Sequence, residues 1–140
     1  MEIILPAANA AIFFSIAALH LYWIIGGSEG MDATIPTDSN GRRKFRPGRG
    51  ITFVVVLGLL LFGLWNLSFA GWLQIQLSPL LTRYGILFIG LIFLMRAIGD
   101  FRYIGFTKRQ RQTRFARLDT SYYTPLCLML AVSHFLLFLI

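Results

Sequence analysis

The chain contains the stretch ITFVVVLGLLLFGLWNLSFA at residues 51–70, in which twenty consecutive positions carry no charged side chain. An α-helix needs about 20 apolar residues to cross roughly 30 Å of hydrocarbon, and lipid offers no partner to an unpaired backbone group. This stretch therefore predicts a helix that crosses a membrane.

Three other apolar segments have a similar length, so the predicted spans are about 6–25, 51–70, 79–98 and 122–140. Ser78 followed by Pro79 is typical of a helix start, because Ser caps the first turn and Pro needs no hydrogen-bond acceptor there. The apolar run that opens at Pro125 is short for a full span, and we expect Tyr122 and Tyr123 to extend it. The pattern predicts an all-α integral membrane four-helix bundle.

Composition agrees with one membrane domain covering residues 1–140. Hydrophobic residues make up 56% of the chain and charged residues only 14%, against about a quarter in soluble domains. The formal net charge is +7, and the basic residues responsible for it lie beside the apolar spans. This position favours membrane lipids over nucleic acid as the anionic partner. Cys127 is the only cysteine, so no intramolecular disulfide forms, and no motif identifies a cofactor.

Lys and Arg are concentrated in two of the three predicted loops. The first loop carries Arg42, Arg43, Lys44, Arg46 and Arg49, and the third carries Arg102, Lys108, Arg109, Arg111, Arg114 and Arg117. Around the junction of the middle spans the only such residue is Arg83, near the start of the span 79–98. Because cytoplasmic loops are enriched in Lys and Arg, the two basic loops are expected in the cytoplasm and both termini on the outer side.

Ionisable side chains within or beside the spans are candidates for function, because such groups are costly in lipid. Four residues qualify: His20, Arg96, Asp100 and His134. Arg96 and Asp100 are four positions apart, which predicts an ion pair on one face of a helix. The pair has two interpretations, a structural contact or part of a ligand site in which the guanidinium keeps donors for an anion.

Two helices carry stripes of polar and aromatic side chains at intervals of three or four residues. The first stripe consists of Asn9, Phe13, Ile16, His20 and Trp23. The last span carries Tyr123, Cys127, Leu130 and His134. Both stripes are expected to face the bundle interior. The histidines and Cys127 lack the spacing of paired ligands, so no metal site is predicted.

Several blocks of the chain resemble the Domain of Unknown Function 3995 family. The specific ones are Arg-Ala-Ile-Gly-Asp-Phe-Arg-Tyr at residues 96–103, Asp-Thr at 119–120 and Tyr-Thr-Pro-Leu-Cys at 123–127, with weaker matches at His-Leu-Tyr-Trp (20–23), Gly-Gly (26–27) and Ile-Pro-Thr (35–37). The resemblance implies a small four-helix membrane protein of the bacterial cytoplasmic (inner) membrane, and it implies no activity.

These observations lead to one hypothesis for a site at the cytoplasmic boundary. His20 and Asp100 are the candidate catalytic acid or base groups. The candidate ligand-binding residues are Tyr22, Trp23, Arg96, Arg102, Tyr103, Asp119 and Tyr123. Arginines would hold negative charge while aromatic rings cover apolar parts, so the expected ligand is a small anionic or lipid-like molecule.

Two other functions fit the same residues. The protein could be a non-catalytic accessory or scaffold subunit whose charges only fasten the bundle. It could also be a small oligomeric transporter or channel, although polar residues become sparse toward the outer end of the spans. Homo-oligomerisation and enzymatic activity both stay open at this point.

Overall fold

The computed structural model describes residues 2–37, 42 and 47–140, and its long helices agree with the predicted spans. They are α1 (Ile4–Ile24), α3 (Arg49–Phe69), α4 (Pro79–Ile98) and α6 (Thr124–Leu139), with short helices α2 (Met31–Thr34) and α5 (Arg114–Leu118). The spans are apolar and long enough to cross a membrane. The prediction of four membrane-spanning helices is confirmed.

The fourth span is longer than the sequence suggested. A π-helical turn, η1 (Asp119–Tyr123), joins α5 directly to α6, so the helical segment Arg114–Leu139 has 26 residues, or about 39 Å at 1.5 Å per residue. Pro125 has no N–H to donate, and it directly follows the π-helical turn, in which the Thr124 N–H reaches back to the Asp119 carbonyl. The long helix α6 thus lies within the predicted span 122–140, and α5 and η1 extend the helical segment before it.

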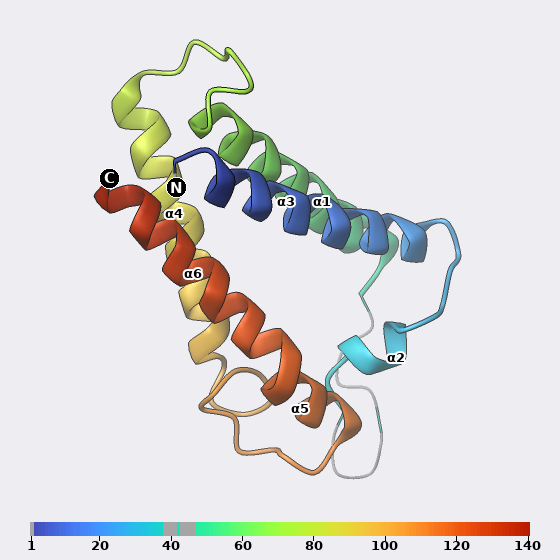
Figure 1. Ribbon diagram of the computed structural model, residues 1–140. Helices are drawn as coiled ribbons and strands as arrows, with labels where there is room; N and C mark the ends of the chain where they lie inside the picture. Colours follow the sequence, from blue (N-terminus) through green and yellow to red (C-terminus); the bar gives the residue numbers. More distant parts are fainter. Residues whose placement is uncertain (1, 38–41, 43–46) are drawn as a thin grey trace.

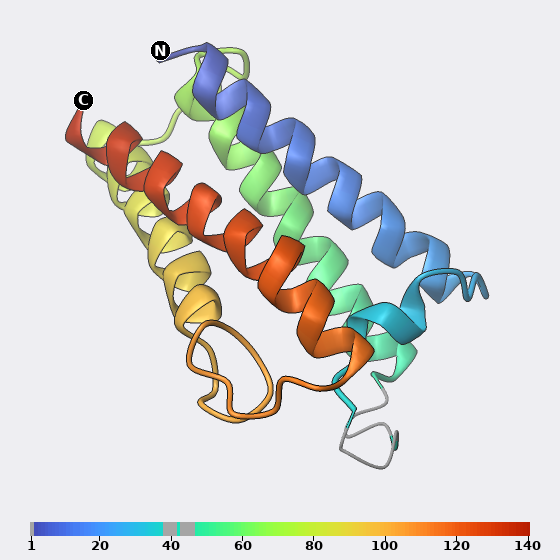
Figure 2. The ribbon, with the colours of Figure 1, turned by 60° about the horizontal axis from the view of Figure 1, so that its bottom comes forward.

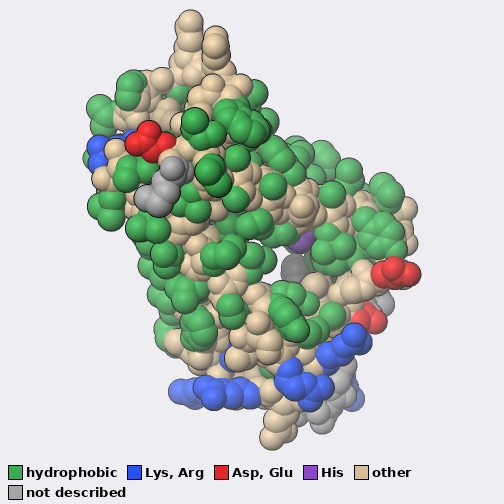
Figure 3. All heavy atoms as spheres, viewed as in Figure 1, with side chains coloured by type: hydrophobic (Ala, Val, Ile, Leu, Met, Phe, Trp, Pro, Cys, Tyr) green, Lys and Arg blue, Asp and Glu red, His purple; other side chains and the backbone are tan. Residues whose placement is uncertain are grey.

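The four spans pack as two pairs. α1 lies along α3 and α4 lies along α6, while contacts between the pairs are far fewer. The pairs approach each other near the two chain ends and diverge toward α2 and α5 (Figure 1), and the second view shows the long helices running in the same general direction (Figure 2). A hollow is visible between the α1–α3 pair and α6 (Figure 3).

The two ends of the bundle differ in charge. We use "terminal end" for the end with residues 2–3, 70–78 and 140, and "basic end" for the end with residues 25–37, 47–48 and 99–113. Visible Lys and Arg side chains gather mainly at the basic end (Figure 3). Both chain ends lie together at the terminal end, as the prediction of four crossings requires.

An apolar core joins the pairs through Phe13. Its ring lies 5.8 Å from that of Phe62, 5.4 Å from that of Phe93 and 5.7 Å from that of His134, measured between centroids. Phe13 and Leu130 have no exposed surface. The prediction that the stripes around Phe13 and Leu130 face inward is confirmed for their central residues.

A buried polar network lies beside this core and connects three helices. The Asn9 amide donates to Asn66 Oδ1 (3.3 Å), the Asn66 amide lies 3.1 Å from His134 Nε2, and Ser133 Oγ donates to Asn9 Oδ1 (3.0 Å). The His134 Nδ1 atom is 2.7 Å from the Leu130 carbonyl, so a neutral ring donates there and accepts from Asn66. The network ties α1 and α3 to α6 on the terminal side of the bundle.

Candidate functional site at the basic end

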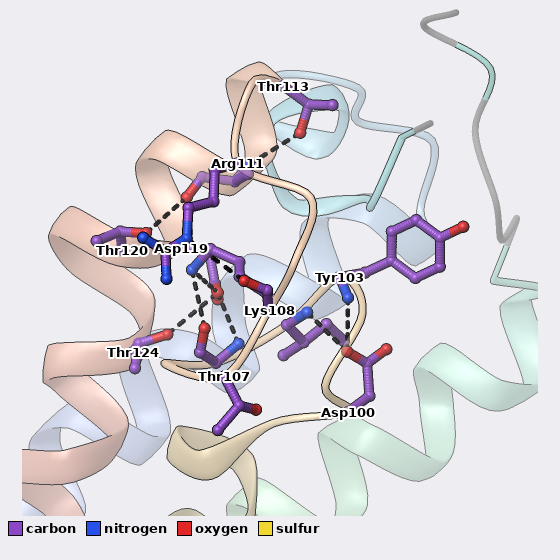
Figure 4. Close-up of polar contacts among 12 residues, drawn as sticks. Asp100, Tyr103, Thr107, Lys108, Arg111, Thr113, Asp119, Thr120 and Thr124 are labelled. Atoms are coloured by element: carbon purple, nitrogen blue, oxygen red, sulfur yellow. Dashed lines mark hydrogen bonds and ion pairs between the residues drawn. The ribbon is translucent and has the colours of Figure 1, made fainter. Parts of the chain in front are cut away.

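The predicted ion pair between Arg96 and Asp100 is wrong, because α4 ends before Asp100. Gly99, with φ 92°, ends the helix, so the four-residue spacing no longer places the two side chains on one face. Asp100 Oδ1 instead accepts the backbone N–H groups of Arg102 (3.0 Å), Tyr103 (2.7 Å) and Ile104 (2.9 Å). Asp100 therefore shapes an exposed turn (Figure 4).

The electrostatics of Asp100 follow from this turn. Partial burial would raise the pKa of its carboxyl group, but the three backbone N–H groups outweigh burial and hold the pKa below its ordinary value. A carboxylate with a lowered pKa is a weak proton acceptor. This geometry fits a role for Asp100 in organising the loop better than the catalytic role predicted from the sequence.

Asp119 is the centre of the polar site at this end. It has no exposed surface, and its Oδ1 accepts from Arg96 Nη2 at 2.9 Å. Its Oδ2 accepts from Lys108 Nζ (2.9 Å), the Gly105 backbone N–H (2.9 Å) and Thr124 Oγ1 (3.1 Å). Figure 4 shows Lys108 and Thr124 converging on this carboxylate from different segments.

The loop after α4 reaches Asp119 because it folds back over the end of that helix. The backbone N–H of Phe106 donates to the Ala97 carbonyl (2.9 Å), and Thr107 Oγ1 donates to the Ile98 carbonyl (2.6 Å). These bonds satisfy carbonyls that a helix C-terminus leaves open. Gly105, with φ 81°, sits where an added Cβ would collide with the same helix end. The fold-back brings Lys108 to the carboxylate.

The charges in this cluster do not balance. Lys108 is buried, with 3% of its side chain exposed, and Arg96 is one-third exposed, so two cations share the single carboxylate of Asp119. Lys108 Nζ also donates to the Gly105 carbonyl at 3.0 Å. Within the described residues, Arg96 Nη1 is buried and has no hydrogen-bond partner. The cluster carries a formal excess of one positive charge.

The comparison with protein families agrees with the resemblance found in the sequence at residues 96–103, 119–120 and 123–127. The family model described as "Protein of unknown function (DUF3995)" matches residues 13–134, which include the whole loop from α4 to α6. The chain belongs to this family. No curated protein and no solved structure matches it significantly.

The other site residues predicted for this DUF3995 protein do not all converge on the cluster. His20 Nδ1 is 2.8 Å from the Ile16 carbonyl and its ring lies 4.9 Å from that of Trp23, so these two form a separate group at the end of α1. Tyr22 is exposed and covers Gly27. Of the predicted residues, Arg96 and Asp119 are the two that meet in the buried cluster.

The remaining predicted residues lie around the basic end. Arg102 lies over the ring of Tyr103, 5.2 Å from its centroid, on the exposed turn. Tyr123 Oη donates to the Ala33 carbonyl at 3.3 Å and so links η1 to α2. This bond bridges the two helix pairs at the end where they diverge.

One feature of the site and one of the buried network near the terminal end could not be recognised in the sequence. Lys108 is one of several basic residues in its loop, and its burial depends on the fold-back over α4. His134 and Asn66 are far apart in sequence, and their contact follows from helix packing. A His and an Asn within predicted spans indicate hydrogen bonds between helices, but the sequence does not show which residues pair.

Proposed function

We propose that this protein binds the anionic group of a small or lipid-like molecule at Arg96, on the basic end of the bundle. The supporting observation is Arg96 Nη1, a buried donor without a partner in a cluster that has excess positive charge. An unpartnered buried donor costs about 1–3 kcal/mol, and an anionic ligand removes that cost.

Asp119 positions Arg96 for this role. The bond from Nη2 to Asp119 fixes the guanidinium, and the exposed third of the side chain is the direction from which a carboxylate or phosphate approaches. A small shift of the side chains that cover Nη1 then completes a two-pronged contact. Lys108 keeps Asp119 ionised and does not itself face the ligand, because its nitrogen is already bonded to Asp119 and Gly105.

A catalytic form of the proposal rests on His20. Its Nδ1 is engaged by the Ile16 carbonyl, which leaves Nε2 as the nitrogen for proton transfer. The ligand must then extend from Arg96 toward α1, as a lipid-like molecule lying between the diverging helix pairs would. The scaffold function is the competing proposal, and it is favoured by the full set of bonds on Asp119.

Removal of Arg96 tests the binding proposal. In neutral detergent, a short-chain phosphatidic acid is expected to bind the parent protein most strongly and the Arg96→Lys variant with intermediate strength, because lysine keeps the charge but loses the fork. It should bind Arg96→Gln about tenfold or more weakly than the parent, because charge-assisted hydrogen bonds are lost. Native mass spectrometry measures the bound fraction, and the uncharged diacylglycerol analogue shows whether the charge is required.

Arg109→Gln is the matched control, because it removes an exposed arginine at the same end that belongs to no candidate site. It should leave binding unchanged. Thermal unfolding of each variant shows that the fold is kept. If Arg96→Gln binds the lipid as strongly as the parent does, the ligand proposal fails and the scaffold function is favoured.

We also propose that the basic end faces the cytoplasm of a bacterial cell and that the termini lie outside. The support is the concentration of Lys and Arg in the loops at that end. In a Cys127→Ala background, an impermeant maleimide added to intact cells should label Gln74→Cys but label Arg109→Cys only after the membrane is permeabilised. Both positions are exposed. The opposite labelling pattern would show that the orientation is inverted.

A further inference from the structure

A groove on the α4–α6 pair lies at the terminal end, away from the polar cluster around Asp119. It has a volume of about 430 Å³ and is lined by Pro79, Leu80, Arg83, Tyr84 and Phe138. Arg83 is the only Lys or Arg between residues 50 and 95, so it stands apart from the basic loops. The groove therefore combines one isolated cation with an apolar and aromatic lining.

Contacts with the last turn of α6 hold the Arg83 side chain in place. Its Nε donates to the Phe138 carbonyl at 3.0 Å, and its guanidinium carbon lies 4.9 Å from the centroid of the Phe138 ring. The Tyr84 ring packs 5.9 Å from that of Phe138 on the same side. Within the described part of the chain, no hydrogen bond uses Nη1 or Nη2 of Arg83. Both nitrogens are thus available on a guanidinium whose position is already fixed.

The depth of the groove indicates what occupies it. Pro79 begins one apolar span and Leu139 ends another, so the groove lies at the level where hydrocarbon meets lipid headgroups. A phosphate accepts two parallel N–H bonds from an arginine, and the rings and Leu80 suit the glycerol and first methylene groups beside it. We infer that this groove binds the phosphodiester group of an anionic phospholipid from the leaflet at the terminal end.

This inference does not depend on the Arg96 proposal, because the two arginines lie at opposite ends of α4. It also differs from capture of free phosphate, for which the apolar lining would serve no purpose. A second copy of the chain could cover the same face, and the experiment separates these occupants.

The test uses the full chain in neutral detergent, with phosphatidylglycerol as the probe and native mass spectrometry as the readout. Arg83→Gln should lower the retained phosphatidylglycerol about tenfold or more, through loss of the charged fork. Arg83→Lys keeps the charge but loses the fork and should retain an intermediate amount. Arg109→Gln removes an exposed arginine at the basic end, is the matched control and should retain as much as the parent.

Two further measurements decide the remaining outcomes. Tyr84→Leu leaves the bond from Arg83 to Phe138 intact and should weaken phosphatidylglycerol binding with unchanged thermal unfolding, so the inference stays testable if Arg83→Gln fails to fold. Equal retention of phosphatidylglycerol by the parent, Arg83→Gln and Tyr84→Leu would overturn the inference. So would displacement of the lipid by inorganic phosphate at equal concentration, or conversion of an oligomer to monomer by Arg83→Gln without loss of lipid.

Discussion

Asp119→Asn is expected to lower the free energy of unfolding by about 3–5 kcal/mol, because it leaves buried positive charge without its counterion. Asp119 has no exposed surface and Lys108 almost none, so water cannot replace the lost contacts. Thermal and denaturant unfolding in detergent measure the effect. This variant should be the most damaging single change at the basic end.

The imbalance of charge in the cluster makes a sharper expectation possible. Lys108→Met removes the excess cation and leaves the pair of Arg96 with Asp119, so it should cost less than Asp119→Asn. Adding Lys108→Met to Asp119→Asn should restore part of the lost stability, which a double-mutant cycle detects. Asp100→Asn is the control and should cost about 1 kcal/mol or less, as for an exposed cap. An Asp119→Asn effect no larger than that of Asp100→Asn would contradict a buried ion cluster.

Asn66→Leu is expected to lower the free energy of unfolding by about 2 kcal/mol. The change removes the partner of Asn9 and of His134 Nε2 at once, and buried hydrogen bonds between membrane helices contribute about 0.6–1.7 kcal/mol each. Because the network connects the two helix pairs, separation of the pairs should accompany the loss. Unfolding in detergent gives the stability, and disulfide cross-linking between cysteines introduced on α1 and α6 reports the separation.

Ser15→Leu is the matched control, because Ser15 bonds only a carbonyl of its own helix and is exposed. Its effect should stay within about 0.5 kcal/mol. Replacing both Asn66 and His134 by leucine should cost less than the sum of the single changes, because they share one bond. Additive effects would show that the amide and the imidazole act independently.

The sequence predicted the spans well because each depends on local signals. Ser78 and Pro79 mark the start of α4 and Gly99 marks its end, and the predicted span 79–98 agrees with the helix. Thr124 and Pro125 resemble a helix start and do begin α6, but α5 and η1 extend the helical segment before them. A π-helical turn leaves no sequence signal as clear as a proline.

The candidate site was predicted in part. Arg96 and Asp119 were both selected, but Arg96 was assigned to Asp100 through the four-residue spacing of a helix that had already ended. Asp119 reaches Arg96 across 23 positions, and Lys108 reaches Asp119 through a loop that reverses direction. Such contacts depend on tertiary structure, so spacing along the sequence could not reveal them.

The arrangement in two pairs also sets an order of assembly. α1 packs on α3 and α4 packs on α6, so each half of the chain forms a hairpin from neighbouring helices, and contacts between near neighbours form early. Ser133 lies 124 positions after Asn9 and cannot meet it until the last helix has been synthesised. During biosynthesis, Asn9 and Asn66 of the first hairpin can bond each other before their partners Ser133 and His134 are present. The buried network forms fully only when the second hairpin packs on the first.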